Sequence, residues 1–308
     1  MGACACNNNK KIKIEITGKF LIGMFRYDAA IMFYLRKIRQ RTEINHPNIE
    51  NSYKKLGTCM YRIGKYKEAI EILMKCLEFC STKTKDDLYM CDIYKILANC
   101  YDTVLNYASA AEFFIKTQKI LVKYHKKRDK IILDLYSSIS KCYTSQGKFD
   151  LSIKYTEKAR KHLESEPYFP PDLADIYINL GTLHRFLRKY EDSYRLYKKA
   201  ASILLKSFPP LCQFLENVYL YIGMSCEWLG NIDEAEQFYQ MFIKSREATT
   251  EKGDMTLINS YELMIDFYKR HSDVKTPTEN YVKKCRDVVI DYVNSKKSVT
   301  QIEGNVLS

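Results

Sequence analysis

The sequence lacks any long hydrophobic run. Its longest apolar stretches, Phe20 to Phe25 and Ala29 to Leu35, are much shorter than the roughly 20 residues that a membrane-spanning helix needs. No secretory signal precedes these stretches. The chain is therefore predicted to be cytoplasmic, and either soluble or anchored at a membrane surface.

The sequence also has little that could carry catalysis. It contains no glycine-rich loop of the kind that holds phosphates, and its histidines show no metal-ligand spacing among themselves or with cysteine. The five histidines are His46, His125, His162, His184 and His271. We therefore expect a protein that is not an enzyme and that has neither a metal nor a cofactor.

The sequence instead contains six copies of a seven-residue motif, each with a tyrosine at its third position. The first copy reads Asn51-Ser-Tyr53-Lys-Lys-Leu56-Gly57. The tyrosines are separated by 41, 42, 41, 42 and 42 residues, and they are Tyr53, Tyr94, Tyr136, Tyr177, Tyr219 and Tyr261. A period this regular indicates a solenoid of identical units. These units are called repeats 1 to 6, and positions are counted from the tyrosine.

Two positions of each repeat predict a helical hairpin. Position +4 is small in repeats 1 to 5 (Gly57, Ala98, Ser140, Gly181, Gly223), and so is position +16 (Ala69, Ala110, Ser152, Ser193, Ala235). Because helix backbones approach closely only where side chains are small, each pair of positions predicts a contact between two antiparallel helices. A short turn, often with glycine as at Gly64, Gly147 and Gly230, joins the two helices.

This layout resembles the tetratricopeptide repeat (TPR), and its period resembles the long repeats of kinesin light chains and Pins-type adaptors. The resemblance covers residues 48 to 295 and is carried by Leu56-Gly57, Gly64, Tyr66 and Ala69 in repeat 1. It implies an all-α, right-handed superhelical solenoid of antiparallel helix hairpins. It also implies a scaffold or adaptor that binds protein partners in a concave groove lined by the first helix of each repeat.

The chain is expected to divide into four parts. Residues 1–11 are a leader, 12–47 a degenerate N-terminal repeat, 48–294 the array of six repeats and 295–308 a polar tail. The degenerate repeat keeps Gly18, Tyr27 and Ala30 at matching offsets but has no tyrosine at its start. Repeat 6 departs furthest, with Ile265 and Pro277 at the two small positions, which suggests a capping role.

The cysteines show no tight spacing. Four of them lie six or seven residues after a repeat tyrosine, in the apolar stripe of the predicted first helices: Cys59, Cys100, Cys142 and Cys226. We expect buried free thiols in a reducing compartment.

The predicted groove changes character along the array. Repeats 1 to 3 present polar and mostly basic residues there, whereas repeats 4 and 5 present Ile178, Asn179, Arg185, Phe186, Leu220, Tyr221, Met224 and Trp228. Exposed aromatic and methionine side chains are enriched at interfaces, so this set is the predicted binding site for a peptide. Trp228, the single tryptophan, and Met224 form its centre, unless packing between repeats buries them.

A polar ladder accompanies this groove. Position −2 is always Asn or Asp, as in Asn51, Asp92, Asp134, Asp175 and Asn217. Such residues could accept hydrogen bonds from a ligand backbone, or they could serve the N-termini of the first helices, where acceptors are favoured.

The leader resembles that of doubly acylated peripheral membrane proteins. Gly2 follows the initiator methionine, Cys4 and Cys6 follow closely, and lysines come next. Myristate on Gly2 and palmitate on Cys4 or Cys6 would make a lipoprotein, because one acyl chain alone binds too weakly. The usual serine or threonine at the sixth position is Cys6, so an unmodified leader is the alternative.

The net charge is +12, from 49 basic and 37 acidic residues. It favours acidic partners or an anionic membrane surface. No nucleic-acid partner is expected, because no base-reading motif is present. The function that the sequence favours is a protein-interaction scaffold. The alternatives are an architectural spacer in a cytoskeletal or ciliary assembly and a basic protein that binds anionic surfaces.

Overall fold

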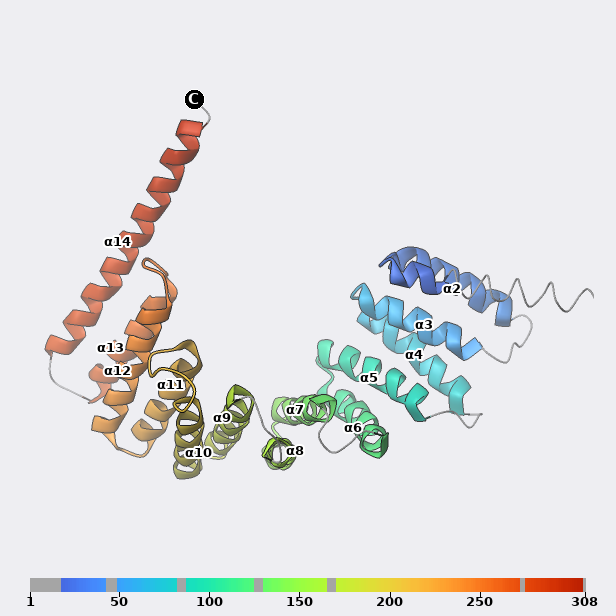
Figure 1. Cartoon of the computed structure of the whole chain (residues 1–308), viewed down its shortest axis with the longest axis horizontal. Coiled ribbons are helices and arrows are strands. Elements are labelled where there is room, and N and C mark those ends of the chain that lie inside the picture. Colours follow the sequence, from blue (N-terminus) through green and yellow to red (C-terminus); the bar gives the residue numbers. More distant parts are fainter. Residues whose placement is uncertain are drawn as a thin grey trace, which may run out of the picture. The chain divides into compact units, whose positions relative to one another are not determined.

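The computed structural model describes residues 18–42, 49–81, 87–124, 130–164, 170–271 and 275–306 (Figure 1). All regular secondary structure in these ranges is helical. Residues 18–23 are helical and are followed by the helices α2 (Tyr27–Thr42), α3 (Ile49–Arg62), α4 (Tyr66–Ser81), α5 (Asp87–Thr103), α6 (Tyr107–Tyr124), α7 (Lys130–Ser145), α8 (Phe149–Leu163), α9 (Pro170–Phe186), α10 (Tyr190–Leu204), α11 (Gln213–Trp228), α12 (Ile232–Thr249), α13 (Thr256–His271) and α14 (Lys275–Val306). The predicted all-α fold of helix hairpins is confirmed.

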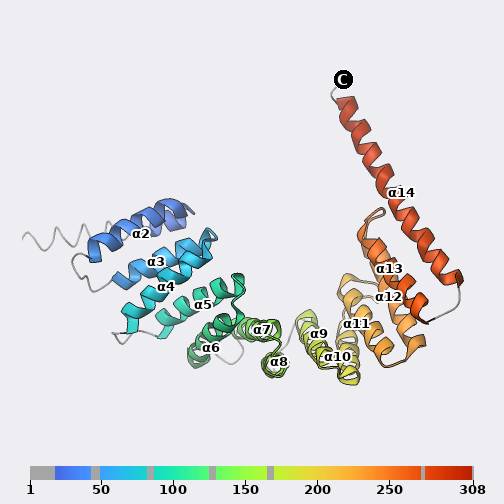
Figure 2. The same cartoon turned by 180° about the vertical axis from the view of Figure 1, so that it is seen from behind.

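The chain forms two compact halves, residues 1–162 and 163–308. In the N-terminal half, α3 pairs with α4 and α5 with α6, and α2 lies beside α3 (Figures 1 and 2). In the C-terminal half, α9 pairs with α10, α11 with α12 and α13 with α14. α14 continues past residue 294, the predicted end of the array, to Val306.

The two halves carry very different charge. Residues 1–162 contain 31 basic and 16 acidic residues, whereas residues 163–308 contain 18 basic and 21 acidic residues. The whole excess of positive charge therefore belongs to the N-terminal half, and the C-terminal half is slightly acidic.

Every described hairpin turn has the same backbone. The residue at position +11 has positive φ, both where it is glycine (Gly64, Gly147, Gly230) and where it is not (Phe25, Leu105, Arg188). Its N–H donates to the carbonyl at position +8, and the next N–H donates to the carbonyl at +7, as in Gly230 N to Glu227 O at 3.1 Å and Asn231 N to Cys226 O at 2.9 Å. This is the Schellman pattern that ends a helix. Because Phe25 occupies the same place, the hairpin at 18–42 follows the register of the repeats.

A large side chain at position +20 fills the space beside the small residue at position +4. A Cβ added to Gly57 would lie 2.5 Å from Leu73, and one added to Gly181 would lie 2.6 Å from the ring of Tyr197. Gly223 and Tyr239 form the same pair in repeat 5. The predicted close contact between the two helices of a hairpin is therefore correct, and the +20 residue is the partner that the sequence analysis did not identify.

Repeat 3 makes the same contact with hydroxyl groups. The Oγ of Ser140 lies 2.8 Å from the Oγ of Ser152 and 2.6 Å from the Oγ1 of Thr156, and Thr144 Oγ1 lies 2.7 Å from Ser152 Oγ. Ser140, Ser152 and Thr156 are buried, so these bonds satisfy polar groups that burial would otherwise leave without partners.

The four first-helix cysteines lie in the core, as predicted. Cys59, Cys100, Cys142 and Cys226 are fully buried and free. Burial raises the pKa of each thiol, to about 11 for Cys59, Cys100 and Cys142 and to about 12 for Cys226. These side chains are therefore protonated packing residues at neutral pH.

Candidate functional site: a cavity between α11 and α13

A cavity of about 720 Å³ opens between the first helices of repeats 5 and 6. Residues of α11 and α13 form its walls, and the buried ring of Tyr239 from α12 closes its floor. The lining comprises Met224, Glu227, Trp228, Tyr239, Asn259, Glu262, Leu263, Asp266, Arg270 and His271. The α11 and α13 residues other than His271 occupy positions −2, +1, +2, +5, +8 and +9 of their repeats, which are the positions of the predicted groove and ladder residues in repeats 4 and 5.

Trp228 is the most exposed large apolar residue of the C-terminal half among the described residues. Its side chain is 63% exposed, although its ring stacks on Tyr190 with centroids 5.2 Å apart. Met224, one turn earlier on α11, is half-buried and packs against the core of this half. Leu263, also half-buried, faces the same cavity from α13. The three side chains offer an apolar surface that a ligand could cover.

Glu227 connects three helices at one wall of the cavity. Its Oε2 accepts a hydrogen bond of 2.7 Å from the hydroxyl of Tyr239, and its Oε1 lies 2.8 Å from Nη2 of Arg270 and 2.8 Å from Nε2 of His271. Burial acts to raise the pKa of this carboxyl, but the hydrogen bonds from Tyr239, His271 and Arg270 outweigh it, so the pKa is lowered. Glu227 is therefore a charged structural anchor that holds α11, α12 and α13 together.

The remaining acidic groups of the cavity are open to solvent. Glu262 and Asp266 are exposed and lie one turn apart on α13. Asp266 forms a loose ion pair of 3.6 Å with Lys269 on its own helix. Since Arg270 and His271 are directed at Glu227, the open part of the cavity combines apolar side chains with a negative rim.

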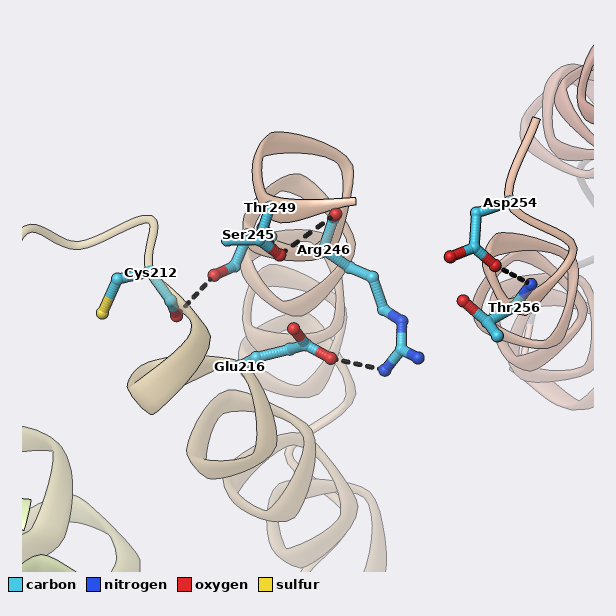
Figure 3. Close-up of polar contacts among 7 residues, drawn as sticks. All are labelled: Cys212, Glu216, Ser245, Arg246, Thr249, Asp254 and Thr256. Atoms are coloured by element: carbon cyan, nitrogen blue, oxygen red, sulfur yellow. Dashed lines mark hydrogen bonds and ion pairs between the residues drawn. The ribbon is translucent and has the colours of Figure 1, made fainter. Parts of the chain in front are cut away.

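A network of polar contacts fixes the opposite ends of the same helices (Figure 3). Arg246 at the end of α12 pairs with the buried Glu216 near the start of α11, and Ser245 Oγ donates to the carbonyl of Cys212 at 2.9 Å. A carboxylate oxygen of Asp254 accepts a 2.8 Å hydrogen bond from the N–H of Thr256, the first residue of α13. A second, polar cavity of about 480 Å³ lies here. These contacts join the end of α12 to the start of α11 and cap the start of α13.

The structure brings together only part of the predicted peptide site. Met224 and Trp228 line the cavity, whereas the other six residues do not. Tyr221 stacks on Tyr197 at 5.3 Å, and Ile178 and Leu220 pack against the core. Asn179 and Phe186 are exposed, and the guanidinium of Arg185 lies 5.2 Å from the ring of Phe186.

The residues of the predicted polar ladder have different surroundings. Asp92 is exposed and accepts a 2.7 Å hydrogen bond from Lys54 of the preceding repeat. Asn217 lines the polar cavity of Figure 3, and Asn259 lines the larger one. The remaining members are half-buried or exposed: Asn51, Asp134 and Asp175.

The basic lining predicted for repeats 1 to 3 is partly neutralised. Lys54 pairs with Asp92, and Lys141 lies 2.9 Å from Asp102 of the preceding repeat. Lys54 also lies 4.2 Å from the ring centroid of Tyr89. These pairs link adjacent first helices of the N-terminal half.

The predicted acylation sites Gly2, Cys4 and Cys6 lie outside the described residues. No described helix combines the length and the hydropathy that crossing a bilayer requires. In the same ranges, no three His, Cys, Asp or Glu residues are grouped as metal ligands.

The α13 side of the cavity was missed in the prediction from sequence. Asn259 belongs to the predicted polar ladder. The other α13 residues of the cavity were not singled out, because repeat 6 was interpreted as a cap from Ile265 and Pro277; they are Glu262, Leu263, Asp266 and Arg270. The signal that could have identified them is Tyr261, which keeps the 42-residue spacing. Pro277 lies in the first turn of α14, where proline is tolerated.

Comparison with known proteins supports the repeat assignment. Models of the tetratricopeptide repeat match residues 18–82 and residues 174–203. No curated protein matches the chain at a significant level.

Solved structures with this fold cover most of the chain. The C-terminal part of a TPR repeat-containing protein from Cytophaga hutchinsonii has a TM-score of 0.60 at 18% identity, over 89% of this chain and 94% of that one. The TPR-like repeats of a putative kinesin light chain from Podosopora anserina have a TM-score of 0.54 at 13% identity, over 67% and 99% of the two chains. A tetratricopeptide repeat protein from Parabacteroides merdae has a TM-score of 0.52 at 14% identity, over 90% and 92%.

At these identities the structural matches establish the fold alone. Together with the two repeat models and the period of 41 to 42 residues, they identify the helical hairpins. Residues 18–82 and 174–203 match the tetratricopeptide repeat, and the helix hairpins of the chain have the fold of tetratricopeptide-repeat proteins.

Proposed function

We propose that the protein is an interaction scaffold whose C-terminal half binds a short peptide segment between α11 and α13. An apolar side chain of the peptide would contact Met224, Trp228 and Leu263. A basic side chain would lie beside Glu262 and Asp266. The observation that carries the proposal is the cavity of about 720 Å³, which combines an exposed tryptophan with a negative rim.

The apolar part of the proposal is supported by the state of Trp228. A tryptophan that is 63% exposed loses unfavourable contact with water when a ligand covers it, and tryptophan is enriched among residues that dominate binding energy. Its stacking on Tyr190 limits the freedom of the indole ring before binding, so less conformational entropy is lost when a ligand arrives.

The charge of the ligand follows from the rim. Glu262 and Asp266 are exposed carboxylates beside the apolar surface, while Glu227 is saturated by Tyr239, Arg270 and His271. The C-terminal half as a whole has more acidic than basic residues. A peptide that presents lysine or arginine next to a large apolar residue complements both features.

Selection from a random peptide library tests this proposal, with the full chain as bait. We expect enriched peptides to pair a large apolar residue with lysine or arginine, and to shift the fluorescence of Trp228, the only tryptophan. Removing the side chains with Met224→Ala and Trp228→Ala should weaken binding of a selected peptide by about 2 kcal/mol or more, measured by calorimetry.

Leu205→Ala provides the matched control, because Leu205 is also exposed in the C-terminal half but does not line the cavity. It should leave affinity unchanged, and Glu262→Lys should weaken basic peptides most. Peptides that bind the double alanine variant as tightly as the wild type would place the site elsewhere and overturn the proposal.

Membrane tethering forms a second part of the proposal. A leader acylated at Gly2 and at Cys4 or Cys6 would hold the scaffold at a membrane and concentrate it near membrane-bound partners. This part depends on the sequence of the leader alone.

A further inference from the structure

We infer that the first hairpin, the helical segment 18–23 with α2, carries a lipid-binding surface for anionic membranes that is independent of acylation. Its exposed side chains combine large apolar groups with basic groups. Three observations support this inference: the packing of α2, the composition of its exposed face and the charge of the N-terminal half.

The packing of α2 determines which face is free. Ala30, Ile31 and Tyr34 are buried and form a core cluster with Leu56 and Cys59 of α3. The opposite stripe of α2 faces solvent, with Met32, Leu35, Arg36 and Arg39 spaced at i, i+3, i+4 and i+7. This face therefore mixes methionine and leucine with two arginines.

The apolar part of the hairpin is large and very exposed. The exposed fractions are 61% for Phe20, 55% for Met24, 78% for Phe25, 69% for Met32 and 42% for Leu35. Within residues 278–294 of α14, the exposed large apolar residues reach at most 55%. Met24 and Phe25 are neighbours at the turn, and Met32 and Leu35 lie one turn apart on α2. Large apolar side chains at such exposure indicate an interaction surface.

The charge of the hairpin favours an anionic membrane as the occupant. Residues 18–42 contain six basic residues and only one acidic residue, Asp28. Lys19, Arg26, Arg36 and Arg39 are all exposed. Aromatic and methionine side chains that enter the headgroup region, flanked by lysine and arginine at the level of the phosphates, are the features of helices that lie on a membrane surface. The net excess of 15 basic residues in the N-terminal half would add attraction of longer range.

Sedimentation with lipid vesicles tests the inference directly. The full chain carrying Gly2→Ala, Cys4→Ser and Cys6→Ser, which removes all three predicted acylation sites, is mixed with vesicles of phosphatidylcholine alone or with 30% phosphatidylserine. We expect binding only to the anionic vesicles. The pair Arg36→Glu and Arg39→Glu should weaken binding by at least about tenfold, because each basic group near the surface contributes attraction to anionic lipid. The pair Phe25→Ser and Met32→Ser should also weaken it by at least about tenfold.

Matched controls come from later repeats. Leu105 occupies the same turn position as Phe25, with positive φ and 68% exposure, so Leu105→Ser should leave binding unchanged. Lys148 and Lys154 are exposed lysines at the start of α8, so Lys148→Glu with Lys154→Glu should have a much smaller effect than the arginine pair. Equal losses in test and control variants would mean that only general charge attracts the protein, and would overturn the proposal.

A tryptophan placed on the hairpin gives a second readout that does not depend on the measured affinity. In a Trp228→Phe background, Phe25→Trp places the only tryptophan on the hairpin. Brominated lipids should quench its emission when the protein is bound. Binding without quenching would overturn the proposal. Loss of vesicle binding when RNA is added at equal concentration would also overturn it, because the surface would then bind nucleic acid. Because acylation is absent throughout, these outcomes are independent of whether the leader is lipidated.

Discussion

Glu227 shows how one side chain can define a site without being available to its ligand. The carboxylate closes one wall of the cavity and accepts hydrogen bonds from Tyr239, Arg270 and His271, which come from α12 and α13. The negative charge of Glu227 is therefore compensated by side chains of the protein itself. The exposed Glu262 and Asp266, on the opposite helix, are the carboxylates that remain for a basic ligand.

Replacing Glu227 with glutamine should have an effect that depends on pH. The folded pKa of Glu227 is lowered from 4.5, so its ionised form stabilises the folded state above that value, and this stabilisation is lost as pH falls through the folded pKa. Glu227→Gln should therefore lower the free energy of unfolding by about 1.5 to 3 kcal/mol at pH 7, the typical worth of hydrogen bonds to a charged group. The difference from wild type should shrink below about pH 4.5.

Denaturant unfolding followed by the fluorescence of Trp228 measures this difference at a series of pH values. Glu262→Gln serves as the control, because an exposed carboxylate should change stability by less than about 0.5 kcal/mol. An equal loss for Glu227→Gln at pH 7 and at pH 3 would show that the charge of Glu227 is not what stabilises the three helices.

At the scale of the element, the hairpin turn explains what the sequence could and could not predict. Glycines at 64, 147 and 230 indicated turns, and the period placed them correctly. Leu105 and Arg188 adopt the same left-handed conformation without glycine, because the packing of two long helices determines the turn between them. The +20 residue was missed for a similar reason, since Leu73, Thr156 and Tyr239 differ in type and only the space beside the small +4 residue relates them.

Glycine at position 188 should stabilise the C-terminal half. Arg188 has φ of 58°, a conformation that costs a side-chain-bearing residue about 1 kcal/mol or more relative to glycine. Arg188→Gly should therefore raise the free energy of unfolding by up to about 1 kcal/mol, less the entropy that glycine gains in the unfolded chain. Gly230→Ala, where φ is 80° and no atom would meet the added Cβ, should lower it by a similar amount. Opposite signs in the two unfolding curves are the expected result, and a loss of stability in Arg188→Gly would contradict it.

The candidate site was predictable only where the register of the repeats was clear. Met224 and Trp228 were identified because position and residue type agreed. The α13 wall was not, because the small residues that define a hairpin are replaced by Ile265 and Pro277 in repeat 6. Periodicity predicts which positions face a groove, but the depth of a cavity depends on side chains such as Tyr239 that approach from the second helix.

At the scale of the whole molecule, the two proposed surfaces belong to different halves. The basic, apolar hairpin lies in residues 1–162, and the acidic cavity lies in residues 163–308. This division fits a scaffold that meets a membrane with one half and a basic peptide with the other. If both proposals hold, occupation of one surface should leave the other available.

Titration of a selected peptide into the protein, with and without saturating anionic vesicles, tests this independence. Trp228 reports peptide binding from the C-terminal half, and the peptide's own partitioning into vesicles is measured separately and subtracted. We expect the two dissociation constants to agree within about twofold, since separate sites share no coupling free energy. An affinity that falls tenfold on vesicles would mean that the lipid covers the cavity or changes its shape, and that membrane and peptide compete for the same protein.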